Sequence, residues 1–159
     1  VVLEADDIKD ACDPHVIGSY IRSDGALAEL LYVDGGASSS DEVGKLRMQG
    51  REVYRHAVGK IADAIETLLG QHGLSIADVD WFVPHQANKR IIDGVAKRIG
   101  LPAEKTVVTV QKHANTSAAS IPLALHELVA GGRVRSGDLI MLEAMGGGLT
   151  WGANLIRWQ

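Results

Sequence analysis

Apolar residues recur at every third or fourth position in three stretches of the chain, the spacing of helices that bury one face. The first stretch covers residues 50–71, about six helical turns at the usual pitch. The second covers residues 86–99 and ends at Gly100, and the third covers residues 121–132 and ends in glycine. The apolar positions of the first stretch are Val53, Ala57, Ile61, Ile65 and Leu68. We therefore expect three amphipathic helices.

Shorter apolar runs bounded by Gly, Asp or Pro predict strands. Two β-rich segments near the start, residues 15–24 and 26–36, are joined through Asp24-Gly25, a pair that favours a hairpin. Because strands and helices alternate after residue 50, the sequence predicts the α/β class, with parallel strand pairs and a final hairpin. The later strands are expected at residues 78–84, 106–110, 138–145 and 149–158.

Composition narrows the possible functions. The chain has 159 residues, 46% hydrophobic and 23% charged, which fits one compact domain with a core. Its net charge of -4 gives no broad basic field for nucleic acid, and its apolar runs are too short to span a membrane. The single cysteine, Cys12, excludes an internal disulfide and fits a reducing compartment. We expect a cytoplasmic protein that binds neither nucleic acid nor membrane.

The segment WFVPHQANKRI, residues 81–91, places a histidine directly after an apolar run. Pro84 cannot donate to a sheet ladder, so the strand is expected to end there, with His85 between it and the next helix. The positive end of that helix disfavours a second positive charge, which favours a neutral imidazole able to donate one hydrogen bond. His85 is therefore either a donor to a developing oxyanion or a structural histidine bonded to a backbone carbonyl.

Two further loops carry hydrogen-bond donors. In HANTSAASIP, residues 113–122, Asn115 is placed at another strand-to-helix turn, where it is either an amide donor or a helix cap. The small side chains after it leave room for a ligand near the backbone. In MGGGLTWG, residues 145–152, three glycines make either a tight hairpin or a turn whose N–H groups hold an anion. We expect the three loops to converge at one edge of the sheet.

The segments VPHQANKRI, HANTSAASIP and GGGLTWG, in this order, resemble the C-terminal half of β-ketoacyl-acyl-carrier-protein synthase III. The resemblance implies a thiolase-like layered fold, in which helices pack on a mixed β-sheet. It divides the chain into residues 1–47, the end of an N-terminal half with a β-rich connection, and residues 48–159, a condensing-enzyme domain. The opening VVLEADD looks like a strand already under way, which agrees with half of a longer polypeptide.

The same resemblance implies a Cys-His-Asn site without cofactor or metal. An acyl group from acyl-CoA is loaded on the cysteine, malonyl-acyl carrier protein loses carbon dioxide, and the resulting carbanion attacks the acyl group. By motif position, His85 and Asn115 are the histidine and asparagine, and Gly147 offers its N–H to the acyl oxyanion. The N-terminal half would supply the cysteine, and the resemblance implies a homodimer.

Cys12 does not fit the missing nucleophile. It lies between aspartates in DACDPH, and nearby negative charge raises a thiol pKa. We therefore interpret it as an ordinary loop cysteine, although a cysteine hydrolase built from Cys12, His85 and Asn115 is an alternative. Nor does His113 beside His85 have the ligand spacing of a zinc site, so no metal is expected.

Cationic residues in the second predicted helix suggest a surface for an acidic carrier protein or for phosphopantetheine. Scattered lysines more often mark a solvated helix face. The resemblance assigns the carrier-binding stretch to Gln86, Ala87, Asn88, Lys89 and Arg90, with Arg90 as the main anchor. The expected rim consists of Gly50, Arg51, Arg55, Lys97 and Arg98. A noncatalytic carrier-binding module, which needs no nucleophile, is the second functional hypothesis.

Overall fold

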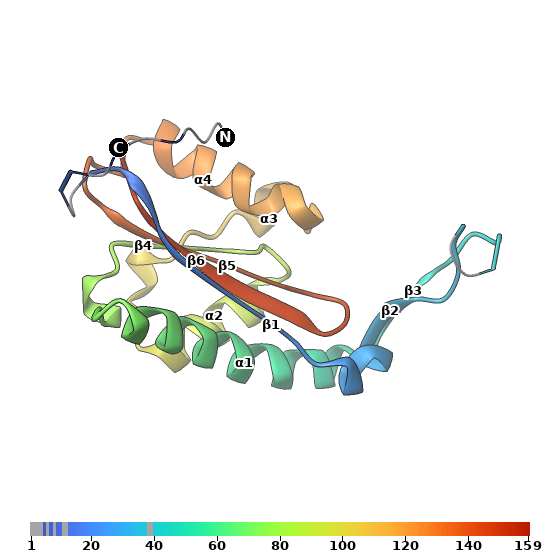
Figure 1. The fold of residues 1–159 in the computed structure, drawn as a ribbon. Helices are drawn as coiled ribbons and strands as arrows, with labels where there is room; N and C mark the ends of the chain where they lie inside the picture. Colours follow the sequence, from blue (N-terminus) through green and yellow to red (C-terminus); the bar gives the residue numbers. More distant parts are fainter. Residues whose placement is uncertain (1–4, 6, 8, 11–12, 38–39) are drawn as a thin grey trace.

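The computed structural model of the chain describes residues 5, 7, 9–10, 13–37 and 40–159 (Figure 1). The strands are β1 His15–Ser23, β2 Leu31–Val33, β3 Leu46–Met48, β4 Trp81–Pro84, β5 Leu139–Gly146 and β6 Thr150–Arg157. The α-helices are α1 Gly50–Gln71, α2 Lys89–Ile99, α3 Val110–His113 and α4 Ser120–Ala130. Short 3-10 helices are η1 Gly25–Leu30, η2 Ile76–Asp78, η3 Ala103–Lys105 and η4 Ser117–Ala119. The predicted α/β class is confirmed.

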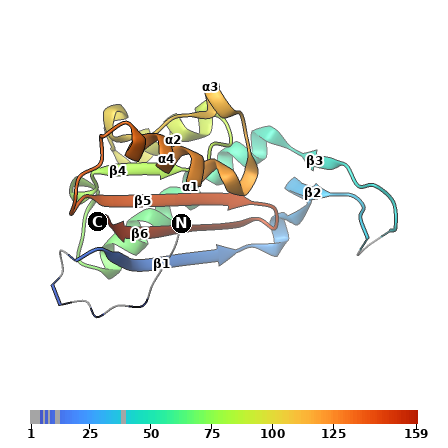
Figure 2. The same cartoon turned by 90° about the horizontal axis from the view of Figure 1, so that it is seen from above.

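Four strands form a mixed sheet in the order β1-β6-β5-β4 (Figure 2). β4 and β5 are parallel, and the chain between them passes through α2, α3 and α4. β6 is antiparallel to both of its neighbours, β5 and β1. The final hairpin is confirmed, since β5 and β6 pair as far as Gly146 and Thr150.

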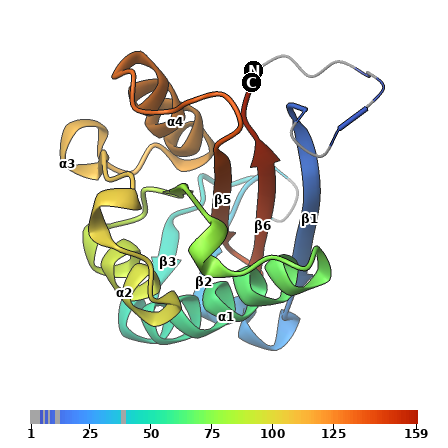
Figure 3. The same ribbon diagram turned by 90° about the vertical axis from the view of Figure 1, so that its left-hand side faces the viewer.

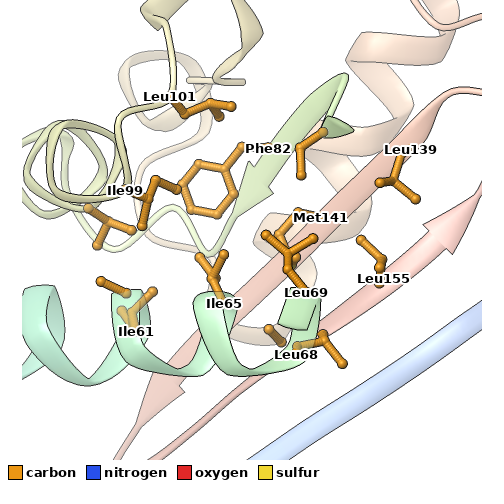
Figure 4. Close-up of a cluster of buried hydrophobic side chains, with 14 of the residues drawn as sticks. Ile61, Ile65, Leu68, Leu69, Phe82, Ile99, Leu101, Leu139, Met141 and Leu155 are labelled. Atoms are coloured by element: carbon orange, nitrogen blue, oxygen red, sulfur yellow. The ribbon is translucent and has the colours of Figure 1, made fainter. Parts of the chain in front are cut away.

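The helices lie in layers on the two faces of this sheet. α1 and α2 cover one face and α4 lies on the other (Figures 1 and 3). Strand alternation decides which side chains meet which helix: Leu139 and Met141 of β5 join the core with α1, whereas Ile140 joins the core with α4. Figure 4 shows the first core, in which Phe82 of β4 lies among aliphatic side chains of α1 and the end of α2.

The predicted helices are present, and one begins later than expected. α1 has the predicted bounds, Gly50–Gln71. α2 begins at Lys89, because the Asn88 side chain accepts a hydrogen bond from the Ile91 N–H at 3.0 Å and so caps the helix. It ends at Ile99, directly before Gly100, whose φ of 73° is left-handed, as a glycine stop requires.

The predicted hairpin near the start of the chain is wrong. β1 pairs with β6, and β2 pairs with β3, so residues 15–24 and 26–36 do not pair with each other. Asp24 caps the start of η1 instead of forming a hairpin turn, because the Asp24 Oδ1 accepts from the Ala26 N–H at 3.2 Å. The short pair β2–β3 projects from the body of the molecule (Figure 1).

The predicted strand at residues 106–110 is also wrong. Thr106 makes one isolated parallel bridge with Phe82, and the chain then turns into α3 at Val110. The apolar, β-branched sequence favours a strand, but two of its backbone N–H groups bond instead to a side chain, as described below.

The boundary expected after residue 47 does not separate the sheet. β1 belongs to the first of the two predicted parts, yet it pairs with β6 along its whole length. Cys12 lies outside the described residues, so its interpretation stays a prediction. Among the residues that the structure describes, no helix combines the length and the apolar character needed to cross a bilayer.

Candidate active site

The three loops singled out by the sequence line one cavity. His85 follows β4, Asn115 follows α3, and Gly147 lies in the turn between β5 and β6. All three border a cavity of about 530 Å³, which residues of β2 and β3 also line. The parallel strands β4 and β5 end at the same edge of the sheet, which brings the first and third loops together.

His85 is held by both its backbone and its ring. Its N–H donates to the Glu143 carbonyl at 2.7 Å, which fixes the loop to β5. Its ring Nδ1 lies 2.6 Å from the Ser120 hydroxyl oxygen. Burial lowers the pKa of the imidazole, so the ring is neutral at physiological pH. Burial thus favours the neutral ring that the sequence predicts, and α2 itself begins four residues after His85.

Gln86 has a structural position that the sequence did not indicate. The residue is 1% exposed, and its amide Nε2 donates to the carbonyl groups of Pro84 at 2.8 Å and Val107 at 3.1 Å. Its Oε1 accepts from the N–H groups of Thr109 at 2.7 Å and Val110 at 3.0 Å. These bonds replace the expected strand pairing and start α3. The buried Gln86 side chain is thus not exposed for the carrier contact expected of it.

Asn115 lies in a loop of unusual backbone conformation. Ala114 and Ser117 have φ values of 55° and 52°, a region that residues other than glycine seldom adopt. The Asn115 Oδ1 accepts from the Ser117 N–H at 3.0 Å, so the side-chain oxygen holds the turn. Its Nδ2 makes no hydrogen bond within the described part of the chain, and the residue lines the cavity. Asn115 does not cap α4, which starts at Ser120 without a side-chain cap.

Gly147 permits a close backbone approach. A Cβ at this position would lie 2.9 Å from the carbonyl oxygen of Leu31, at the start of β2. The next residue, Gly148, has a φ of 130°, which a larger residue would adopt only with strain. The glycines therefore form the tight hairpin that the sequence allowed, and Gly146 and Gly147 also border the cavity.

The residues expected to bind a carrier occupy the start of α2 and its surroundings. Ala87 is half-buried, and Asn88 is the helix cap. Lys89 pairs with Asp93 at 2.6 Å. The Arg90 guanidinium lies 5.6 Å from the centre of the Tyr54 ring, which places the first turn of α2 beside α1.

The expected rim residues are spread over both helices. Gly50 and Arg51 are exposed at the start of α1, and Arg55 pairs with Glu52 at 2.6 Å. Lys97 and Arg98 stand in the last turn of α2, about 11 Å along the axis from Arg90.

His113 makes a structural contact. Its Nε2 lies 2.8 Å from an oxygen of Glu127, whose second oxygen pairs with Lys112. This contact ties α3 to α4. Within the ranges that the structure describes, no three His, Cys, Asp or Glu side chains gather as a metal site would need.

Comparison with known proteins agrees with this architecture. The family described as "3-Oxoacyl-[acyl-carrier-protein (ACP)] synthase III C terminal" matches residues 69–158, more than half of the chain. The chain belongs to this family. The synthase III resemblance seen in the sequence is confirmed.

The relatives share sequence and fold across nearly the whole chain. It is 57% identical over 159 residues to the β-ketoacyl-[acyl-carrier-protein] synthase III of Chelativorans sp. (strain BNC1), covering 99% of this chain and 49% of that protein. It is 60% identical over 146 residues to that of Allorhizobium ampelinum, covering 92% of this chain and 45% of that protein. The crystal structure of 3-oxoacyl-[acyl-carrier-protein] synthase III from Aquifex aeolicus VF5 matches with a TM-score of 0.84 and 41% identity, covering 96% of this chain and 46% of that one. The chain thus spans about half the length of the curated synthase III proteins it matches, and the thiolase-like C-terminal half is confirmed as its fold.

Proposed function

We propose that this chain forms the C-terminal half of a condensing enzyme that starts fatty-acid synthesis. In this proposal the whole enzyme joins an acyl group from acyl-CoA to malonyl-acyl carrier protein and releases 3-oxoacyl-acyl carrier protein and carbon dioxide. The observation that carries the proposal is the convergence of His85, Asn115 and Gly147 on one cavity in a member of this family.

The chemistry assigned to His85 and Asn115 is stabilisation of a transient negative charge. When the bond to the malonyl carboxylate breaks, carbon dioxide leaves and its bonding electrons spread onto the thioester oxygen. His85 and Asn115 donate hydrogen bonds to that oxygen. A preorganised donor of this kind lowers the barrier by about 3 to 4 kcal/mol. The lowered pKa of His85 supports its role, because the neutral ring donates one hydrogen bond without placing a positive charge in the buried site.

The second step uses a nucleophile from outside this chain. The carbanion attacks the acyl thioester on a cysteine that the preceding half of the polypeptide supplies, and the cysteine thiolate leaves. In this step the Gly147 N–H donates to the acyl oxygen as it becomes negative. No step requires a metal or an organic cofactor.

Carrier binding is assigned to the start of α2. Arg90 is the main anchor, with Lys89 beside it, and the exposed residues at the start of α1 form the rim. Arg90 is supported by its exposed position and by the Tyr54 ring 5.6 Å from its guanidinium, a cation–π contact that favours a defined arginine conformation before a partner arrives. A noncatalytic carrier-binding module would need this surface alone; the shared cavity favours the enzyme.

The site assignment is tested by separating the two half-reactions in the full-length polypeptide. His85→Ala or Asn115→Ala should lower the rate of malonyl decarboxylation at least 100-fold, the usual effect of losing one such donor. Acyl transfer to the cysteine should change far less. His126→Ala, which removes an exposed histidine of α4, is the control. Equal loss of both half-reactions in the two site variants would contradict the assigned roles.

Carrier docking is tested by charge reversal. Arg90→Glu should raise KM for malonyl-acyl carrier protein about tenfold and change kcat much less, since a rim charge acts on association. Arg135→Glu makes the same charge change at an exposed position before β5, away from the start of α2. An Arg90→Glu enzyme whose KM matched that of the control would rule out the docking surface.

Two wider properties belong to the same proposal. We assign the enzyme to the cytoplasm, supported by the low cysteine content. We also expect a homodimer, which the resemblance implies and which the mass of the purified full-length protein in solution would test.

A further inference from the structure

Ser120 is the first residue of α4, and its hydroxyl meets two groups of the loop after β4. The residue is 1% exposed. Its oxygen lies 2.6 Å from His85 Nδ1 and accepts the Gln86 N–H at 3.1 Å. α4 itself is fixed by the second core, in which its side chains pack against β4 and β5. Ser120 is therefore a rigid support for the histidine loop.

The direction of these bonds follows from the single proton of a hydroxyl group. The Gln86 N–H can only donate, so the Ser120 oxygen accepts that bond. The hydroxyl proton then needs an acceptor, and in the described part of the chain the atom within reach is His85 Nδ1. If Nδ1 carried a proton instead, the buried oxygen would face two donors and its own proton would have no acceptor. Such an unpaired buried donor is unfavourable.

Building on the function proposed above, we propose that Ser120 is a positioning residue that fixes the tautomer of His85. The hydroxyl donates to Nδ1, so the neutral ring carries its proton on Nε2. Nε2 is the nitrogen left for the cavity, where it serves as the donor to the enolate oxygen. Ser120 lies five residues after Asn115 on the same segment, so one segment supplies one donor and orients the other.

Nuclear magnetic resonance of the full-length protein, labelled with ¹⁵N at histidine, tests the tautomer directly. The His85 signals are assigned by their loss in His85→Asn. We expect Nε2 to be the protonated nitrogen and Nδ1 to be the acceptor in the unmodified protein. In Ser120→Ala, the Nδ1 resonance should shift and the other tautomer should become detectable.

Kinetics of the same variants test the consequence. Ser120→Ala should lower kcat for decarboxylation about tenfold, which corresponds to about 1.4 kcal/mol, with KM within about twofold. Ser120→Thr, which keeps a hydroxyl, should recover most of the rate. Thr109→Val is the matched control, because it removes a buried hydroxyl that has no partner within the described residues; it should change neither the spectrum nor kcat.

Two outcomes would overturn the inference. One is a proton on His85 Nδ1 in the unmodified protein. This measurement uses the unmodified protein alone, so it does not depend on whether a variant folds. The other is a Ser120→Ala spectrum in which the His85 nitrogens are unchanged. Failure of the proposed function is distinguishable, because it appears as full decarboxylation activity in His85→Ala whatever the tautomer.

Discussion

Replacing Gln86 with methionine should destabilise the protein and disturb the active site together. Methionine keeps similar length and volume, and it removes every hydrogen bond of the amide. Thr109 and Val110 supply the first N–H groups of α3, which have no partner within the helix. Both bond to Gln86 Oε1, so the substitution leaves two donors unpaired, one at the buried Thr109 and one at the half-buried Val110.

The expected loss follows from those two donors. An unpaired buried donor costs about 1 to 3 kcal/mol, so the two together should lower the free energy of unfolding by about 3 kcal/mol. The carbonyl groups of Pro84 and Val107 lose their amide donor as well, which adds to the loss. Because Gln86 links the loop after β4 to the segment that leads to Asn115, kcat for decarboxylation should also fall.

Urea unfolding of the full-length protein measures the change in stability, and hydrogen exchange at Thr109 and Val110 locates it. Gln111→Met is the matched control: Gln111 is exposed and its amide donates one bond, to the Val108 carbonyl at 3.1 Å. The control should lose less than about 0.5 kcal/mol. A Gln86→Met protein as stable as Gln111→Met, with unchanged exchange at both amides, would refute the reasoning.

Two other substitutions have clear expectations. Burial raises the pKa of Glu143 to about 8 from 4.5. The carboxyl group therefore ionises at lower pH in the unfolded state than in the folded state, and it destabilises the protein increasingly as the pH rises from about 4.5 toward 8. Glu143→Gln should remove that dependence and raise the free energy of unfolding by about 3 kcal/mol at pH 7; parallel pH profiles of stability for the two proteins in urea unfolding would contradict this. Gly147→Ala places a Cβ 2.9 Å from the Leu31 carbonyl oxygen, whereas the Cβ of Gly146→Ala meets nothing within 4 Å. In thermal unfolding, Gly147→Ala should lose about 1 to 2 kcal/mol of stability and Gly146→Ala little. Equal losses in the two variants would be inconsistent with the close approach.

Local patterns were sufficient for the elements whose cause is local. The apolar spacing of residues 50–71 predicted α1 with its observed bounds, and the glycine stop at Gly100 ended α2 as expected. Asn88 lies within the predicted helix range. That it caps α2 rather than belonging to it is known only from the structure, in which its side chain accepts from the Ile91 N–H. Pro84 ended β4 at the predicted residue because proline cannot donate to the ladder.

The expectations that failed depended on distant partners. The turn at Asp24 predicted a hairpin, but β1 gains its hydrogen bonds from β6, more than a hundred residues later. The β-branched run at residues 106–110 predicted a strand, but the Gln86 amide takes two of its N–H groups. In both cases local propensity was outweighed by a contact whose partner no local pattern identifies.

The sequence by itself determined the α/β class, the helix faces, the three donor loops and the family resemblance, because each depends on residue type and short-range spacing. Tertiary structure decided how those loops are held. It buried Gln86 at the centre of a backbone network, placed the Ser120 hydroxyl beside His85 Nδ1, and lowered the histidine pKa by burying the ring. Hydrogen-bond direction and desolvation depend on which groups meet in space, and segments distant along the chain meet only when it folds.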